Sequence, residues 1–67
     1  MTDTIVEALT VARKVAGRSL ADVAEHAGVA TNSVCRWECG HGLPGLTGLR
    51  AWAGALGYEL VLVKREG

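Results

Sequence analysis

The fold of this chain is decided by residues 19–40, which read SLADVAEHAGVATNSVCRWECG. The segment holds two short stretches with apolar residues at helical spacing, and Gly28 separates them. Ser19 followed three residues later by Asp22 is typical of a helix N-terminus, because the Ser side chain can accept a hydrogen bond from an unpaired backbone N–H. Gly28 accepts the left-handed backbone that a tight turn requires. The segment therefore predicts two short helices joined by a tight turn, which is a helix-turn-helix.

The apolar residues of this segment also fall where a helix-turn-helix needs them. Ala24 is small enough to lie where the two helices touch. The angle between the helices is expected to be filled by Val23, Ala27, Val29, Val34 and Trp37. Trp37 and Trp52 both lie on apolar stripes, so we expect them in the core rather than stacked on bases.

The segments on either side predict two further helices. Thr4 followed by Glu7 forms a capping box that opens a helix, and Gly17 ends it. Residues 40–45, GHGLPG, form a loop by composition, and a helix is expected after it over about residues 46–56.

After this last helix, the apolar residues no longer follow helical spacing. Residues 58–64, YELVLVK, contain no Gly or Pro and predict a strand with apolar side chains on both faces. A lone strand exposes unpaired backbone N–H and C=O groups, so it must pair, and its simplest partner is the same strand of a second copy, antiparallel about a two-fold axis. We therefore expect a homodimer whose interface includes Tyr58, Leu60, Val61, Leu62 and Val63.

These patterns predict one domain over residues 1–67. Its fold class is mainly all-α: a compact bundle of four to five short helices with a helix-turn-helix, plus one C-terminal β-strand over residues 58–64 that pairs across the homodimer.

Length and composition restrict the class of function. The chain has 67 residues, 49% of them hydrophobic, and seven basic residues balance seven acidic ones. So short a chain buries a small core and has little mass left for a water-excluding pocket, so we do not expect an enzyme. Net zero charge argues against binding of polyanions through total charge alone, although the placement of charge matters more than its sum.

We expect the protein to lie in the cytoplasm of a bacterium or a phage-infected host cell. The N-terminus lacks the pattern of a signal peptide, and no apolar stretch is long enough to span a membrane. The two cysteines are then expected to remain thiols.

Residues 19–40 resemble the helix-turn-helix of the phage repressor and Cro type, the XRE family. The resemblance continues through Pro44, Leu46, Leu49, Trp52 and residues 55–57, and it covers about residues 5–57. It implies a bundle of short helices in which the second helix crosses the DNA backbone and the third lies in the major groove.

By that resemblance, the positions expected to face base edges are Thr31, Asn32, Ser33 and Arg36. Their chemistry suits this role, because Arg can donate two bonds to guanine and Asn can pair with adenine. Asn32 and Arg36 are four residues apart and so share a helix face.

The expected contacts to phosphate come from Ser19, Arg18, Lys14, His41 and Gly42, with Arg50 as a further flanking cation. The sequence departs from the family in two places. Leu20 stands where the family often has a Gln that contacts DNA, and Ala30 stands where the third helix usually has a Ser or Thr cap. The expected DNA-binding face therefore carries few basic residues, and Arg36 lies at its centre.

Arg13 has two interpretations. It is either a further phosphate contact or, as the resemblance implies, the partner of Glu38 in an ion pair that ties the first helix to the end of the third. We favour the pairing, because a partly buried carboxylate needs a partner.

No metal, cofactor or catalytic site is expected. The cluster of Cys35, Cys39, His26 and His41 does not have the spacing of the usual zinc sites. His26 beside Ser19 or Ser33 lacks any accompanying oxyanion element.

The sequence thus favours a sequence-specific transcription regulator, a small repressor or Cro-like protein. It would bind double-stranded DNA at a palindromic operator as a homodimer and act by covering a promoter. The alternative is an antitoxin-type interaction module that neutralises a partner protein and regulates its own synthesis.

Overall fold

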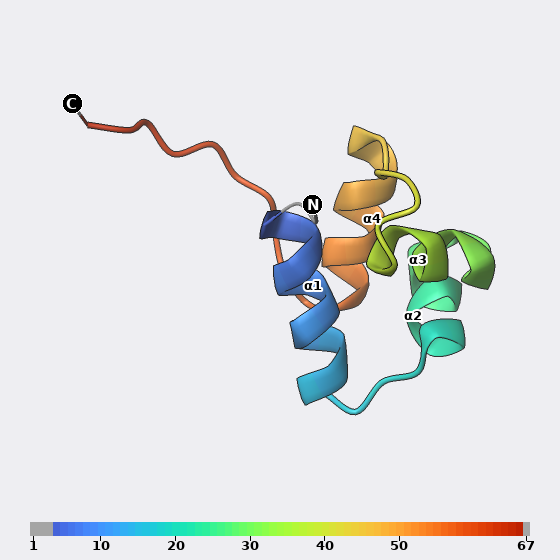
Figure 1. The fold of residues 1–67 in the computed structure, drawn as a ribbon. Coiled ribbons are helices and arrows are strands. Elements are labelled where there is room, and N and C mark those ends of the chain that lie inside the picture. Colours follow the sequence, from blue (N-terminus) through green and yellow to red (C-terminus); the bar gives the residue numbers. More distant parts are fainter. Residues whose placement is uncertain (1–3, 67) are drawn as a thin grey trace.

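The computed structural model describes residues 4–66 and contains four helices (Figure 1). They are α1 (Thr4–Val15), α2 (Leu20–Ala27), α3 (Thr31–Glu38) and α4 (Leu46–Ala55). The regular structure of the described residues is entirely helical, so the prediction of a mainly all-α fold is confirmed. Each helix also lies where the apolar spacing predicts it.

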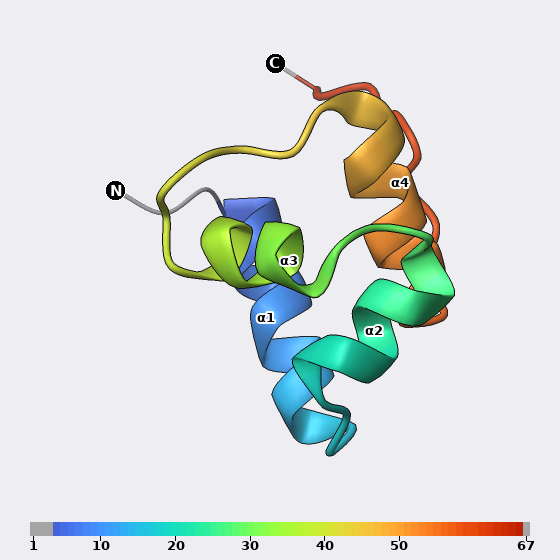
Figure 2. The same ribbon diagram turned by 90° about the vertical axis from the view of Figure 1, so that its right-hand side faces the viewer.

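Helix α2 is bounded by the predicted signals. The backbone N–H of Asp22 donates to the Ser19 side-chain oxygen over 3.0 Å, which caps α2 at its start. Gly28 ends α2 in the left-handed conformation, with φ of +73°. The N–H of Val29 then donates a hydrogen bond back to the carbonyl of Ala24. This helix-ending hydrogen bond requires a left-handed residue at position 28. The turn into α3 follows at once (Figure 2).

The core is small and draws on all four helices. Its buried residues are Val6, Leu9, Val23, Ala24, Val34, Trp52 and Ala53. Helix α2 is central, because it packs against both α3 and α4, while α1 packs against α3. Ala24 is buried, as its expected place at the helix contact requires.

The two tryptophans lie together on the inner side of the bundle. Trp52 is fully buried, and Trp37 is partly buried against the core cluster, with 5.6 Å between the ring centroids. The prediction of two core tryptophans is therefore confirmed for Trp52, and Trp37 occupies the edge of the core. Gly48 of α4 passes close to the Trp37 ring: a Cβ at position 48 would lie 3.1 Å from the ring, so a side chain there would require the ring to shift by a few tenths of an ångström.

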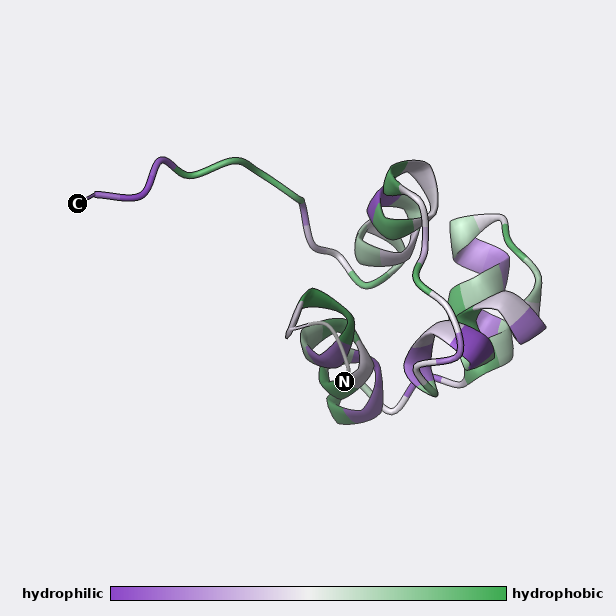
Figure 3. Cartoon of the chain, turned by 45° about the horizontal axis from the view of Figure 1, so that its top comes forward, coloured by the Kyte–Doolittle hydropathy of each residue, from purple (hydrophilic) through white to green (hydrophobic). Residues whose placement is uncertain are grey.

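The predicted strand over residues 58–64 does not form in the single chain. Residues 58–66 carry no regular structure; Leu60 still packs against the core, and the chain beyond it runs away from the bundle, past the start of α1 (Figure 1). The apolar stretch of this tail stands clear of the helices in Figure 3, and Leu62 is fully exposed. The physical reason is that a strand is held by hydrogen bonds to a neighbouring strand, and residues 4–66 supply none.

No helix in the described part of the chain has the length and apolar character needed to cross a membrane.

Two glycine substitutions are expected to change stability in opposite directions. Gly28→Ala should lower the free energy of unfolding by about 1–2 kcal/mol, because a Cβ opposes the left-handed backbone. Gly54→Ala should raise it by about 0.4–1 kcal/mol, because Gly54 is an exposed helical residue whose Cβ would meet nothing within 4 Å. Urea unfolding followed by circular dichroism measures both. Equal effects of the two substitutions would show that Gly28 has no special conformational role.

Candidate nucleic-acid interface

Helix α3 is anchored on one side and exposed on the other. Val34 is fully buried and Trp37 is half-buried, so these two residues hold the helix against the bundle. Thr31, Asn32 and Arg36 are exposed. The positions predicted to face base edges therefore lie on the outer side of α3, with Ser33 half-buried beside them.

Arg36 is the cation of this surface. Among residues 4–66 it takes part in no ion pair, and its side chain is exposed. The only carboxylate on α3 is that of Glu38, which is turned inward and neutralised. The guanidinium without a partner therefore lies one helical turn from an exposed amide at Asn32, so both side chains have hydrogen-bonding groups turned to solvent.

The pair of Arg13 and Glu38 joins α1 to the end of α3. The Arg13 Nε lies 2.7 Å from Oε2 of Glu38 and Nη2 lies 2.8 Å from Oε1, so the contact is bidentate. The remaining nitrogen, Nη1, donates to the carbonyl of Arg18 over 2.8 Å. The two side chains are only 13% and 9% exposed. The structure thus forms the ion pair that the resemblance implies, and each of the three Arg13 side-chain nitrogens makes a contact within the bundle.

The electrostatics of this pair follow from its geometry. The hydrogen bonds to Glu38 raise the pKa of Arg13, and the partial burial of the guanidinium opposes this only in part. The guanidinium therefore keeps its charge at any physiological pH. A bidentate contact of this kind is stronger and more directional than a simple charge pair.

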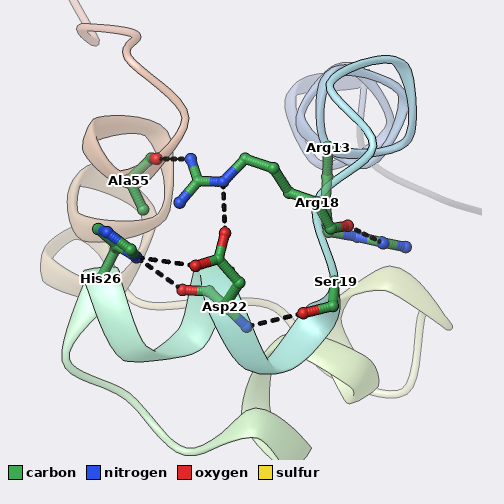
Figure 4. Close-up of polar contacts among 6 residues, drawn as sticks. All are labelled: Arg13, Arg18, Ser19, Asp22, His26 and Ala55. Carbon is green, nitrogen blue, oxygen red and sulfur yellow. Dashed lines mark hydrogen bonds and ion pairs between the residues drawn. The ribbon is translucent and has the colours of Figure 1, made fainter.

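Arg18 also makes polar contacts within the bundle, and its predicted role at phosphate stays a prediction. Its Nε donates to Oδ2 of Asp22 over 2.6 Å, and Nη1 donates to the carbonyl of Ala55 at the end of α4 (Figure 4). The same Asp22 carboxylate lies 3.3 Å from Nδ1 of His26. The hydrogen bond from Arg18 lowers the pKa of Asp22, with a smaller contribution from His26. Sequence reasoning missed this contact, although the spacing of four residues between Arg18 and Asp22 was a signal for it.

The other predicted phosphate contacts are distributed on two sides of α3. Lys14 is exposed near the end of α1, and Ser19 is exposed at the start of α2 with its side-chain oxygen occupied as a helix cap. His41 and Gly42 are exposed in the loop before α4. In both ribbon views α3 lies between this loop and the turn that joins α1 to α2 (Figures 1 and 2). Among the residues predicted to contact DNA, the exposed Lys and Arg side chains are therefore those of Lys14 and Arg36.

No metal site is assembled in the part of the chain that the structure describes. Residues 4–66 contain no group of three or more His, Cys, Asp or Glu side chains that could hold an ion. Cys35 is a half-buried free thiol and Cys39 an exposed one.

No protein-family model matches the chain, and no curated protein matches it.

The Arg13–Glu38 pair is expected to stabilise the bundle measurably. Removal of either partner strands a partly buried charge, so Arg13→Ala and Glu38→Ala should each cost about 2–4 kcal/mol of unfolding free energy. The double substitution should cost clearly less than the sum of the two single ones. Urea unfolding of the four proteins measures the coupling. Glu38→Gln is the matched control, since it keeps the shape and one acceptor and should retain part of the stability. Additive single effects would show that the two side chains do not interact in solution.

Proposed function

We propose that this protein is a sequence-specific DNA-binding regulator of the phage repressor and Cro type, the XRE family, and that α3 enters the major groove. The observation that carries the proposal is the two-sided character of α3. Val34 fixes one side in the core, while Asn32 and Arg36 stand exposed and one turn apart on the other. A short helix held in this way fits a groove about 12 Å wide.

The chemistry of the exposed residues supports base reading. Arg36 would donate two bonds to guanine O6 and N7, and Asn32 would pair with adenine N6 and N7. Thr31 offers a methyl group to a thymine methyl or a hydroxyl to phosphate. The inward turn of Glu38 supports this role further, because its charge is cancelled by Arg13 and does not repel the DNA backbone.

Phosphate contacts would be few. Arg13 and Arg18 are engaged in ion pairs of the bundle, which leaves Lys14 and Arg36 as exposed cations, with Ser19, His41 and Gly42 as further polar contacts. Binding would then depend more on base contacts than on total charge. The dependence of affinity on salt would be shallow, because it scales with the number of phosphates neutralised.

A single α3 offers too few base contacts to select a site in a genome. We propose that two copies associate through residues 58–64, which pair as antiparallel strands about a two-fold axis. Pairing would satisfy the exposed backbone groups of the tail and cover Val61, Leu62 and Val63, which are largely exposed in the single chain. Two recognition helices would then lie about 34–36 Å apart and read an imperfect palindrome.

The base of the tail has a fixed place that suits this pairing. Leu60 packs against the core, so the exposed residues beyond it leave the bundle from a defined point.

Promoter coverage by the bound dimer is the simplest mechanism of regulation. The exposed apolar tail also supports the alternative, in which residues 58–64 bind and neutralise a partner protein of the antitoxin type, and the oligomeric state separates the two.

Selection of bound sequences from random DNA tests base reading. Arg36→Ala should weaken binding to the selected site by about 1–3 kcal/mol and relax the preference at one base position, and Asn32→Ala should change the preference at a nearby one. Arg50→Ala is the matched control: it removes the same charge from α4 and should leave the base preference unchanged. An even loss of affinity across all sequences in Arg36→Ala would assign that side chain to phosphate only. Failure of the wild-type protein to enrich any sequence would overturn the proposed function.

Sedimentation equilibrium tests the pairing of tails. The wild-type chain should be dimeric at micromolar concentration, whereas Val61→Pro should be monomeric, because proline removes a ladder donor. Leu62→Asp should also dissociate the dimer by placing charge in the interface. Val15→Asp, at another largely exposed valine near the far end of α1, should remain dimeric. A monomeric wild-type protein would overturn strand pairing and favour the antitoxin-type alternative.

A further inference from the structure

The last turn of α3 carries two thiols on one face. Cys35 and Cys39 are four residues apart, and the backbone N–H of Cys39 donates to the carbonyl of Cys35 over 3.0 Å, which closes a helical turn between them. Side chains at this spacing are neighbours on a helix surface. Cys35 is half-buried and Cys39 is exposed, so the pair is open to solvent from one side.

The Cys35 thiol, one helical turn away, raises the pKa of the Cys39 thiol. Because a protonated thiol is a poor nucleophile toward peroxides, Cys39 is not suited to rapid oxidation.

The spacing favours a one-atom bridge between the sulfurs over a direct disulfide. Cβ atoms four residues apart on a helix are separated by about 5–6 Å. A disulfide needs its Cβ atoms about 3.5–4.5 Å apart, so it would pull the last turn of α3 out of shape. A soft atom bound to both sulfurs over about 2.3 Å each, as in thiolate–metal bonds, spans the wider gap without moving the backbone.

The ligands available restrict which atom can serve. Two sulfurs alone do not complete a tetrahedral zinc site, and residues 4–66 assemble no third ligand of the usual types around them. Glu38, the nearest carboxylate along the chain, has both oxygens engaged by Arg13. An atom bound at this pair would therefore be held by two sulfurs and would bring its remaining substituent with it.

We propose that Cys35 and Cys39 form a two-thiol binding site for a trivalent arsenical at the end of α3. An organoarsenic dihydroxide, R–As(OH)₂, meets the requirement because arsenic keeps its R group and exchanges two oxygen ligands for two sulfurs. Each thiol gives its proton to an arsenic-bound hydroxide, two As–S bonds form, two As–O bonds break and two waters leave. Arsenic remains trivalent throughout, so no oxidant or reductant is needed.

The place of the site gives its occupation a consequence, which rests on the proposed function. Cys35 lies three residues after Asn32, and Cys39 lies three residues after Arg36, a spacing at which side chains are neighbours on a helix surface. An arsenic atom with an organic substituent here adds bulk beside both base-reading side chains. Occupation would therefore release the protein from DNA.

Phenylarsine oxide, which hydrates to the dihydroxide, is the probe. Intact-mass spectrometry of the reduced wild-type protein should show one phenylarsenic adduct with loss of both free thiols in a thiol-titration assay. A dithiol such as 2,3-dimercaptopropanol should remove it, and a monothiol at equal thiol concentration should not. Cys35→Ser and Cys39→Ser should each bind at least about 100-fold more weakly, because the second bond of a bidentate ligand is lost.

Circular dichroism establishes that the variants are folded, and Cys35→Ala provides a second substitution at the half-buried position. Equal adduct stability in the wild-type protein and in either single variant would overturn the site, because it would show binding by one thiol. Two arsenicals bound per chain would overturn it as well.

A DNA-binding titration separates this proposal from the proposed function. The probe should abolish binding of the wild-type protein to its selected site and leave the double variant C35S/C39S unaffected. Adduct formation with unchanged DNA affinity would overturn the release of DNA while leaving the site established. If the unmodified chain bound no DNA sequence, the proposed function would fail, and the mass measurement would still decide the two-thiol site.

Discussion

The ion pair between Arg13 and Glu38 holds the end of α3 against α1, and the exposed face of α3 depends on it. The core comprises only a few small apolar residues and Trp52, so apolar packing alone leaves each helix with few neighbours. Helix α3 contributes a single fully buried side chain, Val34. A bidentate contact with fixed direction adds what this small core lacks, which is a constraint on the rotation of α3 about its own axis.

The arginines of this protein divide between two tasks. Arg13 and Arg18 contact other parts of the bundle. They form ion pairs with Glu38 and Asp22 and donate hydrogen bonds to backbone carbonyls. Arg36 is left without a partner among the described residues. A chain with no net charge can therefore still expose a single unpaired cation at one place on its surface. Binding through such a cation would depend on its exact position, because one charge contributes little long-range attraction.

The proposed function links the tail to α3. Residues 61–63 expose apolar side chains in the single chain. Under that function, one α3 would present too few contacts to select a DNA site. Pairing of the tails would cover the exposed side chains and duplicate α3 in one association. The two thiols of α3 then lie once in each half of the assembly.

The sequence by itself determined the four helices and the turn at Gly28, because caps and apolar spacing act within one or two turns of chain. It also placed Ala24 and Trp52 in the core. Only the tertiary structure decided that Arg18 reaches the carbonyl of Ala55, since those residues are distant in sequence and meet through packing. The predicted strand over 58–64 failed in the single chain for a related reason: its hydrogen bonds need a neighbour that these residues do not supply. Local signals can be read from the sequence, whereas which cation stays exposed depends on contacts that form only on folding.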